Sequence, residues 1–398
     1  MPEVPRFIQL HFLTAYPASL LNRDDAGFAK RMPLGGAVRT RISSQCLKRH
    51  WRTFDGPYAL DQLRGRESMS VRSRYIFEQI ARPLREEFEG EAVDAMVQIL
   101  SQVVLNPGSS GQNQAEQKSS GLRTSQLIVL GNTEIEHLTN TARELLQQGV
   151  EPKFKNVRSY LEKEGIENLR AIGRGAGLDA ALFGRMKTSD ILADCEAAVH
   201  VAHAFTVHEE QSETDYFTAV DDLVGDFDVE AGAGAGHVNA SEITSGLYYG
   251  YVAVDVPLLI SNLEGVRPSD WQEADPELAG EVTEYLVHLV ATVSPGAKLG
   301  ATAPYSLADF VAVEAGGFQP CTWANAFFDP VQGPRMKERA LERLNRHVQG
   351  LDRMYQPGSK RKYATLLDEG LDAEQAVRAE GVPQLAQWVK RCLTEGVE

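Results

Sequence analysis

Residues 39–52 read Arg-Thr-Arg-Ile-Ser-Ser-Gln-Cys-Leu-Lys-Arg-His-Trp-Arg, with five basic residues and no acidic one, in a chain whose formal net charge is −15. Ser43 and Ser44 are of the residue types that favour a helix N-cap, and the apolar residues after them recur at helical spacing. The basic residues of the expected helix lie opposite this apolar stripe: Lys48, Arg49 and Arg52. The stretch therefore predicts an amphipathic helix that begins at the serine pair.

The start of this helix is a candidate anion site. The N–H groups of a first helical turn have no intrahelical acceptor, and the helix dipole makes that end positive. Arg39 and Arg41 precede the serines and are expected to point the same way. This combination is typical of a site for a phosphate backbone. A basic segment in an acidic protein indicates a localised anionic ligand.

The composition is that of a soluble globular protein. Of the 398 residues, 43% are hydrophobic and 24% are charged, which fits one elaborated domain or two. The four cysteines form no Cys-x-x-Cys pair, so we expect reduced thiols. Neither an apolar signal segment nor a run long enough to span a bilayer is visible. A cytoplasmic protein with no membrane partner, metal or cofactor is expected.

Acidic residues are concentrated in one window. Residues 188–266 contain fifteen Asp or Glu and no Lys or Arg, so the rest of the chain has 40 basic and 40 acidic residues. A solvated face that aids solubility is the simpler interpretation; the alternative is an arm that stays away from phosphates or docks on a basic partner. An acidic total disfavours non-specific nucleic-acid binding but allows a confined basic groove.

The pattern of strands and helices indicates an α+β fold. The expected strands are residues 7–13, 178–183, 197–207, 247–256 and 308–314. The order strand, helix, strand, strand, helix, strand suits a split βαβ, ferredoxin-like sheet. Residues 55–177 are expected to form a helical insertion, and residues 208–246 a hairpin excursion that contains a Gly-Ala run. The tail beyond residue 330 is expected to be helical.

Two further motifs have simple interpretations. Residues 173–177, Gly-Arg-Gly-Ala-Gly, lack the spacing and the preceding strand of a dinucleotide-binding loop, so a turn is expected. His200, His203 and His208 do not converge on one face of a strand. We therefore expect them to be core or rim histidines rather than metal ligands.

Asp24 and Asp25 leave two interpretations open. Paired carboxylates next to Arg23 could hold Mg²⁺ at a phosphate, as in a nuclease. They could also cap the backbone of their own loop or pair with Arg23.

Met186 and Tyr216 are apolar residues in polar surroundings. Met186 lies between Arg185 and Lys187. It could fill the core, or it could insert between bases while the cations bind phosphates. Tyr216 and Phe217 lie on the acidic arm and would be exposed unless they contact a base, a neighbouring subunit or the parent domain.

Several short segments, spread in order along the chain, resemble the CasC family, the repeated backbone subunit of Cascade, which is the CRISPR surveillance complex of the type I-E kind. These segments are residues 21–25 (Leu-Asn-Arg-Asp-Asp), 41–45 (Arg-Ile-Ser-Ser-Gln), 47–49 (Leu-Lys-Arg), 184–186 (Gly-Arg-Met), 202–204 (Ala-His-Ala), 217–223 (Phe-Thr-Ala-Val-Asp-Asp-Leu), 295–298 (Pro-Gly-Ala-Lys) and 324–327 (Ala-Asn-Ala-Phe). The tail beyond residue 330 matches least. Cys46 departs from the pattern and removes a possible hydroxyl contact to phosphate.

The resemblance implies a fold shaped like a right hand. Residues 1–54 and 178–330 would form an RRM-like palm, and residues 55–177 the helical fingers. Residues 208–246 would form a thumb-like β-hairpin within the palm. Residues 331–398 would be a C-terminal helical region that packs on the palm.

The resemblance also implies a non-catalytic protein that polymerises along the spacer of one CRISPR RNA (crRNA). It would hold the phosphates and kink the guide at intervals, so that the guide can pair with target DNA in antiviral defence. The implied partners are the crRNA, the target DNA strand in the heteroduplex, other copies of the chain in a helical stack and other Cascade subunits. Such a subunit must hold any spacer, so it should contact the backbone and leave base edges free.

By the same resemblance, individual residues receive roles. The RNA-binding residues would be Arg23, Arg41, Ser43, Ser44, Gln45, Lys48, Arg49, Arg52, Arg185 and Lys298, with Met186 wedged between bases. The thumb would place Tyr216, Phe217 and Leu223 between the guide and the neighbouring subunit.

Two other functions stay open. In a sister branch of the family the backbone subunits cut target RNA with a loop carboxylate, so Asp24 or Asp25 could make the chain a metal-dependent RNA endonuclease. A metabolic enzyme that binds a small phosphate at the Ser43 helix start would instead be a discrete monomer or dimer with an enclosed pocket.

Overall fold

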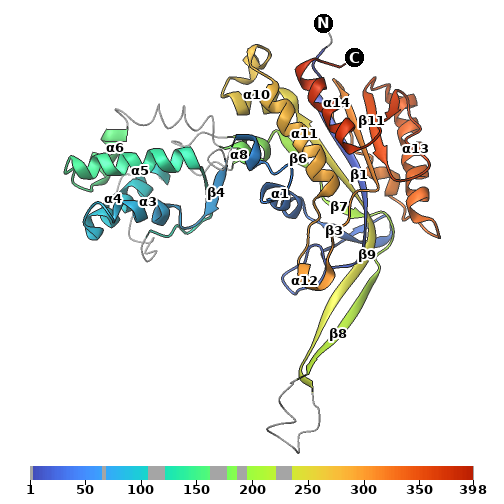
Figure 1. The fold of residues 1–398 in the computed structure, drawn as a ribbon, viewed down its shortest axis with the longest axis horizontal. Coiled ribbons are helices and arrows are strands. Elements are labelled where there is room, and N and C mark those ends of the chain that lie inside the picture. The colour runs from blue at the N-terminus through green and yellow to red at the C-terminus, as the bar shows by residue number, and fades with distance from the viewer. Residues whose placement is uncertain are drawn as a thin grey trace, which may run out of the picture. The chain divides into compact units, whose positions relative to one another are not determined.

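The computed structural model describes residues 3–64, 69–105, 122–161, 177–185, 195–220 and 235–397 (Figure 1). The chain divides into two compact units. The first consists of Met1–Gly56, Val201–Ala253 and Thr283–Glu398, and the second of Pro57–His200 and Val254–Val282. The chain therefore leaves the first unit twice and returns to it twice.

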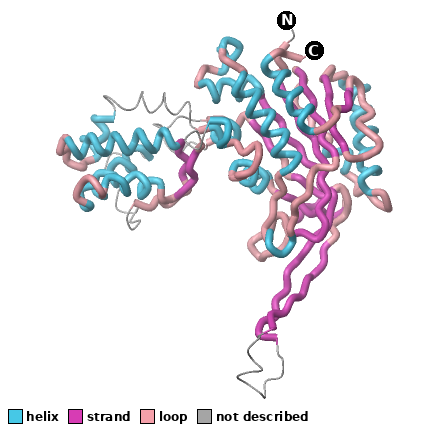
Figure 2. Tube along the Cα trace, in the orientation of Figure 1, coloured by secondary structure: helices cyan, strands magenta, loops and turns pink. Residues whose placement is uncertain are grey.

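A large sheet forms the centre of the first unit, drawn in magenta in Figure 2. Its main path runs in the order β12-β11-β10-β1-β9-β7-β3-β2. The bounds are β1 Phe7–Ser19, β2 Arg31–Leu34, β3 Ala37–Ile42, β7 Ala204–Thr206, β9 Ala235–Asp255, β10 Phe310–Gly316, β11 Lys360–Thr365 and β12 Ala376–Arg378. β10 pairs antiparallel with β1 and with β11, whereas β11 and β12 are parallel.

β1 is a central strand, between β10 and β9, and most of its residues are buried. It pairs with β10 over residues 7–13. Side chains alternate along a strand, so Ile8 and Leu10 point to one face while His11 and Leu13 point to the other.

The helix α13 (Met336–Tyr355) packs on one face of this sheet. The buried residues of the helix recur at helical spacing and share a cluster with β1 and β10: Ala340, Leu341, Leu344, Val348, Leu13 and Phe310. Each fully buried Leu or Phe stabilises the fold by about 1.5–3 kcal/mol. Trp323, just before the 3₁₀ turn η4 (Ala324–Phe327), stacks on His11 with ring centroids 3.6 Å apart.

Four more helices contribute to the first unit, and α11 also enters the second. They are α1 (Ser44–Arg52), α11 (Glu277–Thr292), α12 (Leu299–Thr302) and α14 (Val382–Thr394). α14 packs on β10 and β11. α1 buries Leu47 and Trp51, which lie four residues apart on one face of the helix.

A two-stranded hairpin extends from the sheet where β9 continues past β7 (Figure 1). β8 (Ser212–Val220) pairs antiparallel with the first half of β9, from Ser212 opposite Thr244 to Val220 opposite Ala235. The side chain of Tyr216 on this hairpin is 74% exposed. The hairpin expected between residues 208 and 246 is therefore present, and its tip, residues 221–234 with most of the Gly-Ala run, lies outside the described residues.

The second unit is mostly helical and has its own core. Its described elements are α2 (Asp61–Arg64), β4 (Ser70–Ser73), α3 (Ile76–Leu84), α4 (Gly90–Leu105), β5 (Ile128–Gly131), α5 (Asn132–Gln147), α6 (Phe154–Tyr160), α8 (Leu178–Phe183), β6 (Val199–Val201, which reaches the boundary), α10 (Val256–Glu264) and the 3₁₀ turn η3 (Pro268–Glu273). β4 and β5 form a small antiparallel sheet. Twenty buried residues, including Phe77, Val97 and Leu138, form one cluster.

The structure corrects two sequence expectations. Residues 178–183 form the helix α8 rather than a strand, and all six are buried, so their apolar run reflects burial on every side rather than an extended chain. The tail is helical only in part, because β11 and β12 add two strands to the sheet. Within the described segments, no helix combines the length and apolar character needed to cross a membrane.

Candidate nucleic-acid interface

Ser43 caps α1, as the sequence predicts. Its backbone is extended (φ −70°, ψ 148°), and its hydroxyl oxygen accepts a hydrogen bond from the Cys46 N–H at 3.3 Å. The Ser43 N–H donates to Asn22 Oδ1 at 2.9 Å. The first turn holds no acidic residue, and Gln45 is exposed. The backbone N–H groups of Ser44 and Gln45 belong to the turn that lacks intrahelical acceptors, so they are available to an anion.

Cys46 faces the protein rather than the helix start. Its Sγ lies 3.9 Å from the carbonyl oxygen of Leu21 and 3.7 Å from His50 Nδ1. Burial raises the pKa of this thiol to about 11. A hydroxyl in the same position would face Leu21 too, so the cysteine does not remove a phosphate contact, contrary to the sequence expectation.

The cationic side of α1 is as expected from the sequence. Leu47 and Trp51 are buried, Arg49 is exposed, and Lys48 and Arg52 are half-buried. Long basic side chains can bury their aliphatic stems and keep the charged group in water. Arg49 is therefore the exposed cation of this face, and Lys48 and Arg52 lie half-buried on the same helix.

A loop from far along the chain adds Lys298. The Ala297 N–H donates to the Leu20 carbonyl oxygen at 2.9 Å. The Gly296 N–H lies 3.4 Å from His50 Nε2 on α1. These two contacts hold the half-buried Lys298 next to the helix that carries the other cations.

Arg23 and Arg41 approach from the other side of the helix start. Arg23 is exposed and follows Asn22, which binds Ser43. Arg41 is half-buried at the end of β3; its Nε donates to the Arg31 carbonyl oxygen at 3.1 Å.

Arg39 does not point toward the helix start, and this expectation is wrong. Its side chain is fully buried and donates to the carbonyl oxygens of Thr206 at 3.0 Å, Phe327 at 3.2 Å and Phe328 at 3.3 Å. Side chains alternate along a strand, so Arg39 and Arg41 lie on the same face of β3. Arg39 lies farther from the end of the strand and is buried in the core. Arg39 is therefore a structural residue.

Arg185 is also a structural residue rather than an exposed phosphate contact. It lies in the second unit, where its Nη1 is 2.6 Å from Glu134 Oε2 and both side chains are buried. The same Glu134 oxygen accepts from the Gly131 N–H at the start of α5. Removing either partner would leave a buried charge unpaired.

Other residues assigned by the resemblance cannot be placed. Met186 and Leu223 lie outside the described residues, and Phe217 is described only by its backbone in β8. Tyr216 is described and exposed.

The three histidines between residues 200 and 208 have different surroundings. His208 is buried, and its Nε2 accepts from the Leu247 N–H at 3.1 Å. His200 is exposed and contacts the Ala197 carbonyl oxygen. His203 faces Arg41, with Nδ1 3.0 Å from Nη1. Among the described residues no group of three or more His, Cys, Asp or Glu could hold a metal ion.

Asp24 caps its own loop. Its Oδ1 accepts from the N–H groups of Ala26 and Phe28, both at 3.0 Å. Asp25 is exposed. This geometry favours the capping interpretation of the pair over metal-binding carboxylates.

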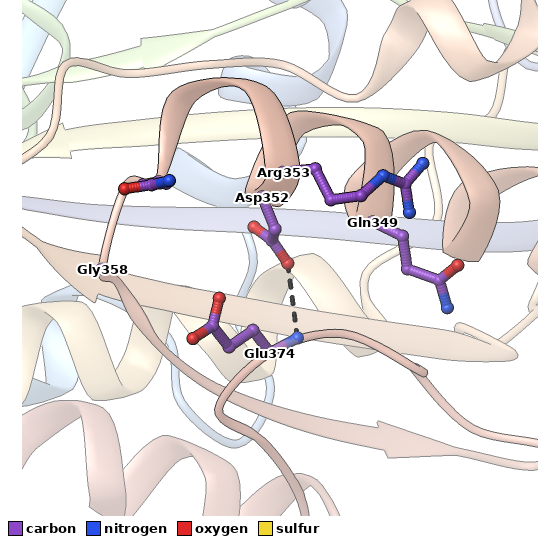
Figure 3. A pocket seen from close by; sticks show the side chains of 6 residues that line it. Gln349, Asp352, Arg353, Gly358 and Glu374 are labelled. Carbon is purple, nitrogen blue, oxygen red and sulfur yellow. Dashed lines mark hydrogen bonds between the residues drawn. The ribbon is translucent and has the colours of Figure 1, made fainter.

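An open pocket of about 730 Å³ lies elsewhere in the first unit, between the end of α13 and the segment that leads into β12 (Figure 3). Asp352 and Glu374 line it, and the Glu374 N–H donates to Asp352 Oδ2 at 3.3 Å. Both Asp352 oxygens also accept from Arg361, which is buried and paired with Glu314 as well. The lining places two carboxylates beside one cation, Arg353, and this balance of charge disfavours phosphate.

Comparisons with known proteins point in one direction. A family model described as "CT1975-like protein" matches residues 8–391. A solved chain described as "CRISPR RNA-guided surveillance complex, pre-nicking" is 27% identical and has a TM-score of 0.77, with 98% of this chain and 100% of that chain covered. Another solved chain, described as "CRISPR RNA-guided surveillance complex", is 22% identical and has a TM-score of 0.68, with 97% of this chain and 99% of that chain covered. At this identity the likeness supports the fold alone. No curated protein matches.

These matches confirm the resemblance to the CasC family and the mixed α+β class. Sequence reasoning gave no joining role to three residues that hold the site together: Asn22, His50 and His203. Asn22 and His203 lie in matching motifs, residues 21–25 and 202–204, but their contacts depend on pairings between distant segments.

Proposed function

Because the chain belongs to the CT1975-like protein family, we propose that it is an RNA-binding subunit of a CRISPR RNA-guided surveillance complex. It holds the sugar-phosphate backbone of the guide RNA and leaves the base edges free for pairing with target DNA. The 27% identical solved chain, which comes from such a complex, supports this assignment.

The observation that carries the proposal is the collection of donors around the start of α1. The capped first turn and the cationic face with Arg49 both belong to α1, and hydrogen bonds join this helix to the Asn22 loop and to the Lys298 loop. Helix N–H groups and flexible cations are ligands for phosphate, and phosphate contacts carry no sequence information. A protein that must hold any guide needs this kind of site.

The palm of the proposed hand is an RRM-like sheet. Four strands, taken in chain order as β1, β7, β9 and β10, lie in the spatial order β10-β1-β9-β7. α1 lies between β1 and β7 in the chain, and α11 lies between β9 and β10. This order of strands and helices supports a ferredoxin-like core enlarged by β2, β3, β11 and β12.

The hairpin of β8 and β9 acts as the thumb in the proposed assembly. The exposed Tyr216 gives it an aromatic contact for the guide or for the next copy of the chain. Copies would stack along one guide in a type I-E complex and kink it at intervals, in the cytoplasm. Other subunits and the target DNA strand would complete the complex.

We propose that the subunit is non-catalytic. The capping bonds of Asp24 supply a structural reason for this carboxylate without a reaction. A nuclease would instead need its acids directed at a metal and a phosphate.

A gel-shift titration with a CRISPR RNA and an unrelated single-stranded RNA tests the proposal. We expect both RNAs to bind with similar affinity, and longer RNAs to give larger assemblies. A discrete monomer or dimer that is indifferent to both RNAs would overturn the proposal. Metal-dependent RNA cleavage that Asp24→Ala or Asp25→Ala abolishes would establish the nuclease instead.

A further inference from the structure

His203 lies near Ser43, the N-cap of the proposed phosphate-binding helix α1. β3 and β7 pair antiparallel, with Ile42 opposite Ala204. Ser43 directly follows the end of β3 and His203 directly precedes the start of β7, so both residues leave the paired strands at the same end. His203 is exposed, so its ring is accessible to a ligand at the helix start.

The contact with Arg41 defines which ring nitrogen of His203 carries the proton. Arg41 Nη1 and His203 Nδ1 are 3.0 Å apart. A guanidinium group can only donate hydrogen bonds, so Nδ1 must be the accepting nitrogen and the proton of the neutral ring must be on Nε2. Arg41 is held on its other side by the Arg31 carbonyl oxygen. The guanidinium is thus positioned between two acceptors.

The charged groups that act on His203 are both cations. Burial, and after it the charges of Arg41 on β3 and of Lys30 just before β2, lower the pKa of His203 below its usual value of 6.5. Arg31, the first residue of β2, forms ion pairs with Glu210 and Glu242. The contact with Arg41 and the lowered pKa therefore both favour the neutral form of His203 in the RNA-free protein.

We propose that His203 is part of the phosphate site and takes up a proton from solvent when RNA binds. This inference rests on the RNA-binding function proposed above. Protonation forms an N–H bond at Nδ1, which turns the acceptor for Arg41 into a donor. Arg41 is then released from His203, and both side chains can donate to phosphate oxygens.

The physical reason is the charge that RNA brings. A phosphate beside His203 adds a negative charge next to Arg41 and Lys30, and this raises the pKa of the imidazole. A group that binds a proton more tightly in the complex makes RNA binding tighter as the pH falls. The effect is confined to the pH range between the two pKa values, and each unit of difference between them is worth about tenfold in affinity.

The test compares His203→Asn with wild type in the full-length chain. Asparagine keeps an acceptor close to the position of Nδ1 but does not titrate. His200→Asn, which changes another exposed histidine outside this cluster, is the matched control. Binding of a fluorescein-labelled oligouridine is measured at constant ionic strength, and the thermal midpoint of each protein shows that it stays folded.

We expect wild type and His200→Asn to gain about threefold to tenfold in affinity between about pH 8 and about pH 5.5 beyond the gain shown by His203→Asn. The proteins should bind alike at the higher pH. Equal pH dependence in all three proteins would overturn the proposal while leaving RNA binding intact. No binding at any pH would overturn the RNA-binding function itself.

A direct readout uses the NMR titration of the His203 ring, assigned through the variant. The pKa of His203 should rise when oligouridine is added. A pKa that stays the same or falls would overturn the proposal.

Discussion

The backbone N–H of Gly296 lies 3.4 Å from Nε2 of His50, and this contact joins the Lys298 loop to α1. His50 Nδ1 is 2.8 Å from the Cys46 carbonyl oxygen, so Nδ1 carries the proton and Nε2 accepts. The ring thus connects the helix that holds Lys48 and Arg49 to a loop almost 250 residues later in the chain. Its position therefore helps to determine where the loop that carries Lys298 lies.

We expect His50→Ala and Lys298→Gln to weaken RNA binding by similar amounts, each by up to about tenfold. Both changes remove the same cation from the site. The double variant should lose little more than either single variant. Fluorescence anisotropy with one RNA measures this cycle. Additive losses would show that His50 does not position Lys298.

The turn between β2 and β3 gives a matched pair of glycine substitutions. Gly35 and Gly36 have φ of +60° and +77°, where alanine costs about 1–2 kcal/mol. A Cβ on Gly35 would also overlap the carbonyl oxygen of Phe328, whereas one on Gly36 meets nothing within 4 Å. We expect Gly35→Ala to lower the free energy of unfolding by about 1–3 kcal/mol more than Gly36→Ala. Urea unfolding measures the difference, and equal losses would mean that the turn is not packed against Phe328.

His11 makes the stability of the chain depend on pH. Burial lowers its pKa even though Glu314 lies 3.2 Å away, so the folded protein binds this proton less readily than the unfolded chain, whose histidine titrates near the usual value of 6.5. The stability that neutral His11 contributes is complete above about pH 6.5. As the pH falls below that value, the free energy of unfolding falls by at most about 1.4 kcal/mol per pH unit. His208, His288 and His347 act in the same direction.

The corresponding experiment follows the unfolding free energy between about pH 7.5 and about pH 5. His11→Gln, which removes one titrating group, should show a shallower decline than wild type. His200→Gln serves as the exposed control. A decline in His11→Gln as steep as that of wild type would contradict the assignment.

Tyr216 provides a test of the hairpin. It is 74% exposed, and Tyr305, at 75%, is an exposed tyrosine outside the hairpin. If the hairpin contacts a neighbouring copy or the guide, Tyr216→Ser should reduce the size of assemblies on a long RNA, while Tyr305→Ser serves as the comparison. Light scattering measures assembly size. If Tyr216→Ser left the size of the assemblies unchanged, this result would contradict a contact of the hairpin with a neighbouring copy or the guide.

The local parts of the fold were predictable because they depend on neighbouring residues. Ser43 caps its helix, the stripe of Leu47 and Trp51 is buried, and residues 7–13 form a strand, since capping and periodicity are properties of short segments. α8 was misjudged because a short apolar run that is buried on all sides has no period to separate helix from strand.

The site was predictable only where its residues share one segment. Arg39 and Arg41 look equivalent in the sequence, but one donates to buried carbonyls and the other ends beside His203. Arg185 has a buried partner, Glu134, that lies 51 residues earlier. Such pairings depend on strand register and packing between distant segments, which a single sequence does not contain.

We propose that the cations of α1 hold an RNA backbone without reading its sequence. The most direct measurement is the salt dependence of binding for two unrelated RNAs, with wild type and with Lys48→Gln, Arg49→Gln and Arg52→Gln combined. We predict that the combined variant binds both RNAs equally weakly, and that the slope of log K against log salt falls by about two, since each phosphate contact contributes about 0.7. An unchanged slope, or a loss confined to one RNA, would contradict the claim.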